Sequence, residues 1–358
     1  MKILYLNITK GVPPRDAVYL DGFRKNGLEI QEYRDNSPGL KKFWNIYKYH
    51  RKHTDTHDIL FVGYSAHILA PFLRLISRRP IIFNALGPLY DGKIIGRTQA
   101  AKFSLLALYC WLADFLAFNS ASLSLIENQT LINYVSRKFL VNKKRLLLAW
   151  TGVNENDFFY DPSIQKLPQF TILFRGDLTK DSGVEYLIEA AKILANTDIK
   201  FRLLARGGLA SKIESILKTF DSKNVEWIKE RLDIADLRKK MQETHLSIGW
   251  LSGRLRAPTS IPHKTFESLA LKLPFLHARL PAMLELLEEN KTGFYCKSDD
   301  VQDLVDKILE LKNNPELLNG VAENGYRLFD QKLRSKYLAK TVLDHLQHSH
   351  ILKNVRML

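Results

Sequence analysis

The chain has 358 residues, of which 46% are hydrophobic and 25% are charged, and these values exclude an intrinsically disordered protein. The length exceeds that of most single hydrophobic cores and predicts two domains of ordinary size. The net charge of +15 is uneven, because residues 1–160 contain 22 Lys and Arg against 12 Asp and Glu.

The two cysteines, Cys110 and Cys296, lie far apart in apolar contexts. This spacing indicates buried thiols in a reducing compartment and argues against a disulfide framework or a metal site. The N-terminal stretch Met1–Asn7 is too short and too quickly polar for a signal peptide, so we expect a first buried strand and a cytoplasmic protein.

The first 150 residues alternate apolar strands with amphipathic helices, which is typical of a parallel sheet covered on both faces. The expected strands are Ile3–Asn7, Leu28–Tyr33, Ile59–Gly63, Pro80–Ala85, Phe115–Asn119 and Leu146–Thr151. The expected helices are Asp16–Asn26, Ser65–Ser77 and Gln99–Ala113.

The apolar stretch Phe103–Phe118 could be mistaken for a membrane span. It is shorter than the ~20 residues that a spanning helix needs, and it contains Asp114. We therefore expect a buried helix that ends near Ala113, followed by the buried strand Phe115–Asn119.

The polar segment 154–168 contains two prolines and is predicted to be the linker between a first domain, residues 1–153, and a second, residues 169–332. A second alternating series fills the latter. Its expected strands are Thr171–Phe174, Lys200–Ala205, Val225–Ile228, Leu246–Gly249 and Phe275–His277. Its expected helices are Gly183–Ala195, Ala210–Phe220, Ile234–Glu243, Lys264–Leu271 and Ala282–Glu289, and three more follow, Val301–Lys312, Pro315–Phe329 and Leu333–Leu346.

The segment from Ser260 to Ala270 predicts a tight loop and a helix start. With Ser260 as N-cap and Pro262 in the first turn, the unpaired backbone N–H groups of the helix can face an anion. Lys264 adds a positive charge there, whereas Glu267, one turn further, suits sugar hydroxyls better than phosphate. A cation beside a carboxylate predicts a nucleotide-sugar site.

At these residues the chain resembles the C-terminal half of the GT-B glycosyltransferases, specifically family four, the glycosyl transferases group 1. In that family a helix-borne Glu holds the ribose of the donor, a role that the resemblance gives to Glu267. The usual second Glu, eight positions earlier, is Thr259 here. A bacterial sub-branch with an Ile-Pro-x-Lys loop and a single Glu, matched by Ile261–Lys264, also lacks it.

The resemblance implies an α/β fold of two Rossmann-like domains facing a central cleft. The first domain would bind the acceptor and the second the nucleotide-sugar, and a last helix, about 333–358, would pack back on the first. The resemblance also implies retention of anomeric configuration, no metal and no cofactor besides the donor substrate.

The second half opens with further matches to the family at Gly176, Gly183, Val184 and Ala190. The Arg that usually follows the first glycine is Asp177 here, and the Lys that usually precedes the second is Ser182. The usual diphosphate clamp is therefore missing. Three cations can replace part of it, or else be merely solvated: Arg175, Lys180 and Arg206.

In the first half, the loop Gly87–Gly92 resembles the Leu-Tyr-Asp sequence of the sub-branch. Asp91 can orient an acceptor hydroxyl or act as base, although Asp before Gly is also an ordinary turn pair. We predict Asp91 and Glu267 as catalytic residues. His67 is more typical of a helix cap or core contact, and the loop Thr9–Arg15 follows the first strand, where the family places acceptor contacts.

The segment Leu40–His53 interleaves aromatic and basic residues. On a helix this pattern favours an anionic membrane surface, and the alternative is a solvated helix whose aromatics pack on their own sheet. Nucleic acid is not expected, because no motif supports it.

These observations predict a glycosyltransferase that moves a sugar from a nucleotide diphosphate donor to a saccharide or lipid-linked acceptor, in cell-surface polysaccharide or glycolipid synthesis. Its expected place is the cytoplasm, peripheral on the inner face of the cell membrane. The alternatives are a sugar-nucleotide epimerase of the same fold and a degenerate, membrane-associated scaffold.

Overall fold

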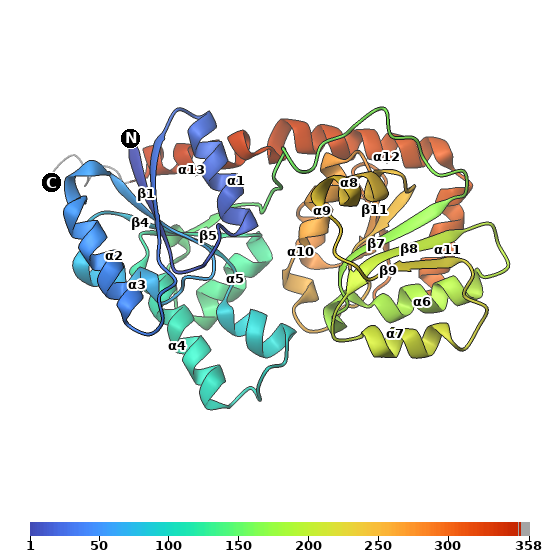
Figure 1. Cartoon of the computed structure of the whole chain (residues 1–358), viewed down its shortest axis with the longest axis horizontal. Helices are drawn as coiled ribbons and strands as arrows, with labels where there is room; N and C mark the ends of the chain where they lie inside the picture. The colour runs from blue at the N-terminus through green and yellow to red at the C-terminus, as the bar shows by residue number, and fades with distance from the viewer. Residues whose placement is uncertain (350, 352–358) are drawn as a thin grey trace. The chain divides into compact units, whose positions relative to one another are not determined.

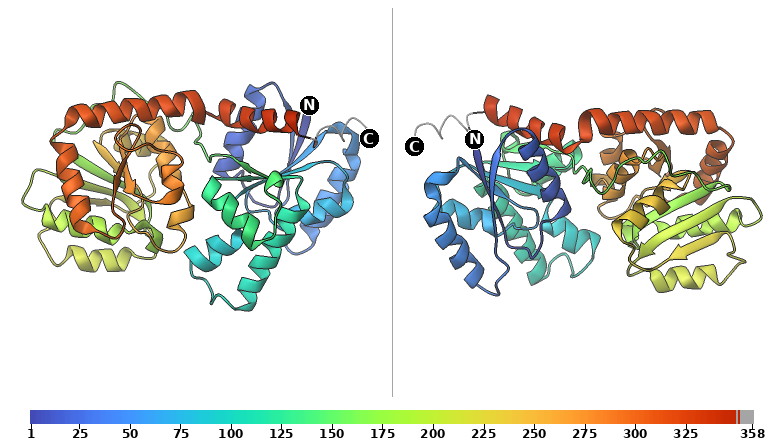
Figure 2. Two further views of the ribbon diagram at one scale, coloured as in Figure 1. Left: turned by 180° about the vertical axis from the view of Figure 1, so that it is seen from behind. Right: turned by 45° about the horizontal axis from the view of Figure 1, so that its top comes forward.

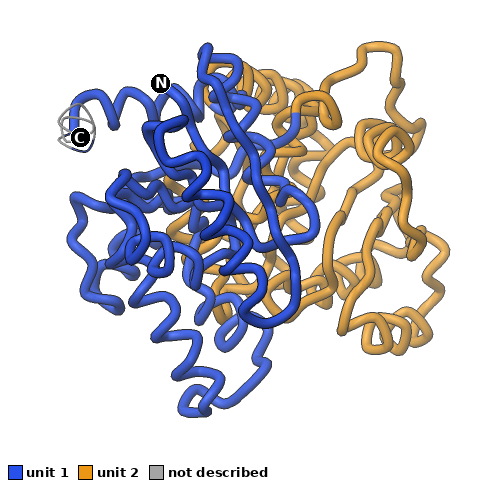
Figure 3. The backbone as a smooth tube through the Cα atoms, turned by 60° about the vertical axis from the view of Figure 1, so that its left-hand side comes forward, with its two compact units in different colours: residues 1–154, 333–358 blue, residues 155–332 orange. Residues whose placement is uncertain are grey.

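The computed structural model describes residues 1–349 and 351, and the chain divides into two compact units (Figures 1 and 3). The first unit comprises residues 1–154 and the segment from 333 onward, and the second comprises residues 155–332. Each unit contains one six-stranded sheet in which every strand pairing is parallel. The predicted pair of Rossmann-like domains is confirmed.

The sheet of the first unit has the order β2-β1-β3-β4-β5-β6, and its central strands β1, β3 and β5 are mostly apolar and buried except for Lys2 at the start of β1. The strands are β1 (Lys2–Asn7), β2 (Glu29–Arg34), β3 (Ile59–Val62), β4 (Ile81–Leu86), β5 (Leu123–Ile126) and β6 (Leu146–Leu148). The helices are α1 (Pro14–Lys25), α2 (Lys41–Lys52), α3 (Leu69–Ile76), α4 (Leu105–Ser120), α5 (Gln129–Lys138) and α13 (Ser335–His348), with the short 3-10 helices η1 (Thr54–Thr56) and η3 (Lys143–Arg145) and the π-helix η2 (Asp91–Gly96).

The predicted strand Phe115–Asn119 is wrong, because α4 runs without a break to Ser120 and the strand lies further on, at β5. Ser104 caps the start of α4 by accepting a hydrogen bond from the Ala107 N–H, and no glycine or proline interrupts the helix afterwards. Asp114 does not end the helix either. Its carboxylate accepts the Leu89 and Tyr90 N–H groups at 2.8 Å each, so it is buried on the helix.

The last helix of the first unit, α13, packs against α1. A Cβ on Gly22 of α1 would stand 2.0 Å from the Ser335 carbonyl oxygen, so the two helices approach too closely for any larger residue. Ser335 Oγ donates to Asp21 at 2.6 Å and accepts from Lys25 at 3.0 Å. The predicted helix 333–358 is therefore present as Ser335–His348, and its continuation over 350 and 352–358 lies outside the described residues.

The sheet of the second unit has the order β12-β11-β10-β7-β8-β9, and the predictions missed only its edge strand β12. The strands are β7 (Thr171–Asp177), β8 (Lys200–Arg206), β9 (Val225–Ile228), β10 (Leu246–Ile248), β11 (Phe275–Ala278) and β12 (Phe294–Cys296). The helices are α6 (Val184–Ile193), α7 (Ala210–Leu217), α8 (Ile234–Gln242), α9 (His263–Ala270), α10 (Pro281–Leu284), α11 (Val301–Lys312) and α12 (Pro315–Leu328), with turns η4 (Lys180–Ser182), η5 (Ala257–Thr259) and η6 (Phe329–Leu333).

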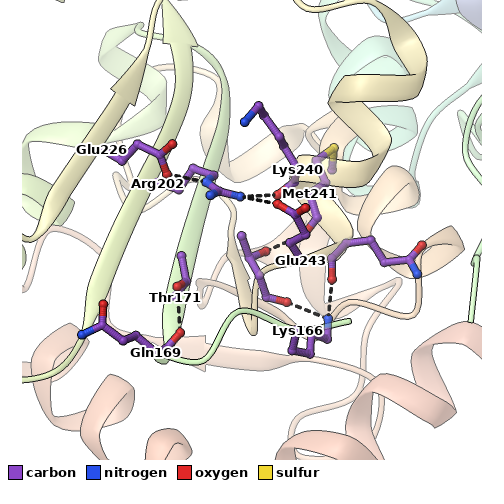
Figure 4. Close-up of polar contacts among 10 residues, drawn as sticks. Lys166, Gln169, Thr171, Arg202, Glu226, Lys240, Met241 and Glu243 are labelled. Carbon is purple, nitrogen blue, oxygen red and sulfur yellow. Dashed lines mark hydrogen bonds and ion pairs between the residues drawn. The ribbon is translucent and has the colours of Figure 1, made fainter. Parts of the chain in front are cut away.

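Part of the segment expected as a linker is fixed to the second unit. Lys166 Nζ donates to the carbonyls of Gln242, the last residue of α8, and of Thr244, at 2.8 and 2.6 Å, and burial lowers the pKa of Lys166 to about 8 (Figure 4). Leu167 N–H also donates to the Glu243 carbonyl, at 2.9 Å. Beside these contacts, Arg202 of β8 pairs with Glu243. The hydrogen bonds of Lys166 and Leu167 thus hold this end of the predicted linker against the second unit.

The two cysteines of the chain are free and buried, as their apolar contexts predict. Within residues 1–349 and 351, none of the helices combines the length and apolarity needed to cross a bilayer.

Candidate functional site

A cavity of about 520 Å³ lies in the second unit, at the carboxyl ends of β7 and β8 and beside the start of α8. Ligands of open parallel sheets bind at the carboxyl ends of the strands, so this is the expected place for a nucleotide. Its lining mixes three carboxylates with four cations, namely Arg175, Arg206, Lys229 and Arg231.

Two glycines shape the mouth of this cavity. Gly176, near the end of β7, has φ +131°, and Gly207, directly after β8, has φ +142°, a region that L side chains rarely adopt. A Cβ on Gly207 would also stand 2.8 Å from the Leu178 nitrogen. The loop after β8 can therefore approach Leu178 closely only because residue 207 is glycine, whereas a Cβ on Gly176 would meet nothing within 4 Å. Gly176, one of the predicted site residues, lines the cavity.

The cations of the cavity differ in whether their charge is already matched. Lys229 pairs with Glu214. Arg206 and Arg231 are exposed and have no ion-pair partner among the residues that the structure describes. Lys180, which the sequence also singled out, is exposed on η4 and is not part of the cavity lining. The unmatched charge beside the cavity thus belongs to two arginines, of which the sequence indicated only Arg206.

Arg175 joins the cavity to α9. Its Nη1 atom lies 3.0 Å from Glu267 Oε2, whereas His263 Nδ1 lies 3.0 Å from Glu267 Oε1. The Glu267 side chain is only 2% exposed. Burial alone would raise the pKa of Glu267, but the Arg175 charge and the His263 hydrogen bond outweigh it and lower the pKa below its ordinary value. Glu267 is therefore an ionised carboxylate.

The contact between Arg175 and Glu267 is an ion pair without an aligned hydrogen bond, since Glu267 Oε2 has no hydrogen-bond partner. Oε2 therefore has an unused acceptor position, and the atom itself is buried behind Arg175. His263 was not singled out from the sequence, although it lies four residues before Glu267, on the same helix face.

Lys264 is buried beneath the strand ends. Its Nζ atom donates to the Gly249 carbonyl at 3.2 Å and lies 3.7 Å from the centre of the Phe174 ring. Burial, followed by repulsion from Arg175, lowers the pKa of Lys264 well below its ordinary value, and Glu267 opposes this shift. The structure thus places three predicted site residues together: Arg175, Lys264 and Glu267.

Ser260 does not cap α9. The helix begins at His263, and Pro262 occupies the N-cap position with no side-chain cap. A proline holds the residue before it in an extended conformation, so the helix cannot start earlier. Ser260 is itself extended and ends the short turn η5, so the prediction that it opens the helix is wrong.

Asp91 is the first residue of η2 in the first unit and is buried. It accepts a hydrogen bond from the Tyr134 hydroxyl at 2.6 Å, and Lys138 Nζ lies 4.0 Å away. Asp91 is thus part of a polar cluster with α5, a helix that the sequence reading missed. Its role as a base or as an orienting group stays a prediction.

His67 lies in the core of the first unit. Its ring meets Phe83 edge to face at 5.0 Å, its Nε2 is 3.4 Å from Asp114, and burial lowers the pKa of His67 to about 4. A neutral imidazole among aromatic rings fits the core-contact reading. Burial also raises the pKa of Asp114 to about 7, although the hydrogen bonds from the Tyr90 and Leu89 N–H groups act in the opposite direction and lower this pKa.

A buried polar network at the strand ends of the first unit was missed by the sequence reading. Asp16 accepts hydrogen bonds from Tyr5, Asn7 and Asn84 at 2.7, 3.0 and 2.7 Å. Arg15 donates to Asn84 at 2.8 Å. The signal in the sequence was a polar residue near the end of an otherwise apolar strand, at β1 and at β4. Because its members satisfy one another, the network organises the unit.

Among the residues that the structure describes, no group of three or more His, Cys, Asp or Glu side chains is arranged to hold a metal ion.

Comparison with known proteins gives a family for the second unit. Residues 158–328 match the model described as Glycosyl transferases group 1. A protein of Methanocaldococcus jannaschii, named as an uncharacterized glycosyltransferase, is 26% identical over 183 residues, which are 51% of this chain and 48% of that protein. The capsular polysaccharide biosynthesis glycosyltransferase CapM of Staphylococcus aureus is 23% identical over 177 residues, 47% of this chain and 43% of that protein. The chain thus spans about half the length of these curated relatives.

Among solved structures, HepE of Anabaena in complex with UDP and glucose is similar over 98% of this chain and 100% of that one, with a TM-score of 0.74 and 15% identity. HepE has also been solved with UDP-glucose. At this identity the similarity establishes the fold. The predicted GT-B fold of two Rossmann-like domains is confirmed.

Proposed function

The chain carries a domain of the glycosyl transferases group 1 family on the GT-B fold, and from this premise we propose that it is a glycosyltransferase. The proposed reaction moves a sugar from a nucleoside diphosphate donor to a saccharide or lipid-linked acceptor. The observation that carries the proposal is the cavity at the ends of β7 and β8, where two unmatched arginines share the lining with Arg175, whose ion-pair partner is a buried carboxylate. This pairing suits the two ends of such a donor, a diphosphate and a ribose.

The arginines of the cavity are proposed to bind the diphosphate. A diphosphate that leaves the sugar gains negative charge in the transition state, and cations fixed in advance stabilise it without reorganisation. Arg206 has no carboxylate to surrender before it binds, whereas Arg175 is shared with Glu267. Lys180 lies outside the cavity lining, so we assign it a lesser part than the sequence alone gave it.

Glu267 is proposed to accept the ribose hydroxyls through Oε2, the oxygen that has no hydrogen-bond partner. His263 and Arg175 hold the carboxylate ionised and in one orientation, which favours acceptance over donation. Asp91 is proposed to orient the acceptor hydroxyl. The acceptor oxygen then bonds to the anomeric carbon of the sugar as the bond to the diphosphate breaks, and the hydroxyl proton leaves with the diphosphate. We further propose that anomeric configuration is retained and that no metal ion is required.

The proposed setting is the synthesis of a cell-surface polysaccharide or glycolipid from cytoplasmic donors. Its support is the similarity to CapM, which is named for capsular polysaccharide biosynthesis. A lipid-linked acceptor would place the enzyme at the inner face of the membrane.

The test measures release of nucleoside diphosphate from a panel of sugar nucleotides, with and without a membrane lipid extract or oligosaccharides. Release that requires an acceptor supports a transferase. Conversion of the donor sugar without acceptor supports an epimerase, and no turnover of any donor supports a scaffold. The paired variants Arg206→Met and Arg231→Met should reduce release, whereas Arg137→Met, an exposed arginine of α5, is the matched control.

A further inference from the structure

The outer face of α4 exposes a row of large apolar side chains to solvent. Leu105 is 87% exposed, Leu108 54%, Tyr109 49%, Leu112 43% and Leu116 49%. These positions are three or four residues apart, so they form one stripe along the helix. Phe103, just before the helix, is fully exposed as well. We call these six side chains the α4 face; contiguous exposed apolar surface of this kind marks an interaction site.

The opposite face of α4 is well packed, so the exposed side chains are not a displaced core. Ala107, Cys110, Ala113 and Ala117 are buried there, and Asp114 is tied to the loop after β4 by two backbone N–H groups. The start of α4 and the loop before it project from the first unit (Figures 1 and 2). The sequence-based expectation of a buried helix that ends near Ala113 is therefore wrong.

The charge around the α4 face has one sign. Lys93, Arg97 and Lys102 precede the helix, and none of them has an ion-pair partner among the described residues. From Gly92 to Ser120 the single acidic residue is Asp114, which is buried. Apolar side chains flanked by cations match the interface of an anionic bilayer, where acyl chains lie next to phosphate groups.

We propose that the α4 face docks on an anionic phospholipid bilayer, with α4 lying in the plane of the interface. Sixteen residues of helix span about 24 Å, less than the ~30 Å of a hydrocarbon core, and one face of α4 packs against the first unit. The helix therefore lies on the bilayer and does not cross it. A symmetric pair of copies would bring the same three cations together, which disfavours a second copy as the occupant. Binding itself is independent of the proposed glycosyl transfer; only its purpose, access to a lipid-linked acceptor, rests on that function.

This proposal changes the role given to the segment Leu40–His53. Within α2, Phe43 packs edge to face on Phe72 at 5.1 Å and Tyr49 stacks on Tyr33 at 4.0 Å, so these aromatics belong to the first unit. Trp44 stays 55% exposed. Because α3 contacts both α2 and α4, the helix α2, which carries the basic residues, lies on the same side of the sheet as α4. We assign α2 electrostatic attraction and α4 the apolar insertion.

The test is co-sedimentation of the full chain with vesicles of phosphatidylcholine and phosphatidylserine. The wild type should bind at physiological salt. The quadruple variant Leu105→Gln, Leu108→Gln, Leu112→Gln and Leu116→Gln should bind at least about tenfold more weakly, because its apolar insertion is removed. The control, Leu140→Gln with Ile193→Gln, changes exposed apolar residues elsewhere and should bind as the wild type does. Both variants should keep the nucleotide-induced thermal shift of the wild type, which shows that they fold.

Three results would overturn the proposal: a wild type that ignores anionic vesicles even at low salt, a quadruple variant that binds as well as the wild type, or a wild-type dimer in light scattering that the quadruple variant abolishes. The last result would make a second copy the occupant. A chain that binds vesicles through α4 but turns over no donor refutes the proposed function alone. A chain that transfers sugar but ignores vesicles refutes the docking surface alone.

Discussion

Replacing Glu267 by Gln separates the two halves of the proposed donor site. The amide keeps the size of the side chain and can still hydrogen-bond with His263, but it removes the negative charge that Arg175 meets at 3.0 Å. If Glu267 accepts ribose hydroxyls, a nucleoside should bind more weakly to the variant. A nucleoside diphosphate should lose less, because Arg175 is then released to the phosphates.

The expected size follows from the hydrogen bonds that change. A bond to a charged acceptor contributes about 1.5–3 kcal/mol and a neutral one about 0.5–1.5, so the nucleoside should lose about 1–1.5 kcal/mol, or roughly tenfold in affinity. Removing one partner of a fully buried ion pair costs about 3–5 kcal/mol of stability. The Arg175 side chain is 27% exposed and can meet water, so we expect a loss of about 1–3 kcal/mol and a folded variant.

The assay is titration calorimetry of wild type and variant with a nucleoside and its diphosphate, using the base that gives the largest thermal shift among UDP, GDP and ADP. Glu226→Gln is the matched control, because it breaks a carboxylate pair with Arg202 away from the cavity. Unchanged nucleoside affinity in folded Glu267→Gln would refute the ribose contact. Equal losses for both ligands would refute the release of Arg175.

Three further perturbations test other parts of the structure. Lys264→Met, which removes the charge and keeps an unbranched side chain one atom shorter, should weaken a nucleoside diphosphate more than a nucleoside in calorimetry; equal losses would rule out a phosphate contact. Asp91→Asn should lower kcat about a hundredfold with donor affinity unchanged if Asp91 orients or deprotonates the acceptor, whereas undiminished turnover would leave it a structural member of the α5 cluster. Burial lowers the pKa of His277 from 6.5 to about 3, so the unfolded chain gains protons first as the pH falls, and the free energy of unfolding should drop from pH 6.5 toward pH 3. Urea unfolding should show a flatter pH dependence in His277→Leu, and an identical slope would contradict this assignment.

The strands and helices of the second unit were largely predictable, because short apolar strand patterns alternate regularly with amphipathic helix patterns in its sequence. The three apolar residues Ile172–Phe174 are followed, after Arg175, by a glycine, and the expected strand Val225–Ile228 is confirmed at the same bounds. The strand β12, Phe294–Cys296, was missed because its three residues lie directly between Gly293 and the polar residues from Lys297 onward, whereas the equally short β10 continues into the apolar residues Trp250 and Leu251. Local sequence thus predicts elements whose own pattern is long enough.

The error at α4 has a different cause. Phe115–Asn119 is apolar and contains aromatics, as a buried strand would, and Asp114 before it looked like a boundary. A short apolar run does not distinguish a strand from a helix, and only tertiary contacts decide between them. Here two N–H groups of the loop after β4 donate hydrogen bonds to the Asp114 carboxylate, so that Asp114 can be buried in the middle of the helix. The apolar side chains that suggested a core helix are instead exposed along the α4 face.

The candidate site illustrates which parts of a binding site a sequence can reveal. Glu267 and Lys264 were found because they lie in one motif on one helix, and Arg175 because it precedes a glycine at a strand end. Nothing in the sequence says that Arg175 meets Glu267, since the two are far apart in the chain and are joined only when β7 and α9 pack together. That contact decides the chemistry: it keeps Glu267 ionised in a buried place and leaves Arg175 divided between a carboxylate and the cavity. A ligand that brings its own negative charge can therefore draw Arg175 away, and the ribose and phosphate contacts of the donor should be coupled through this one arginine.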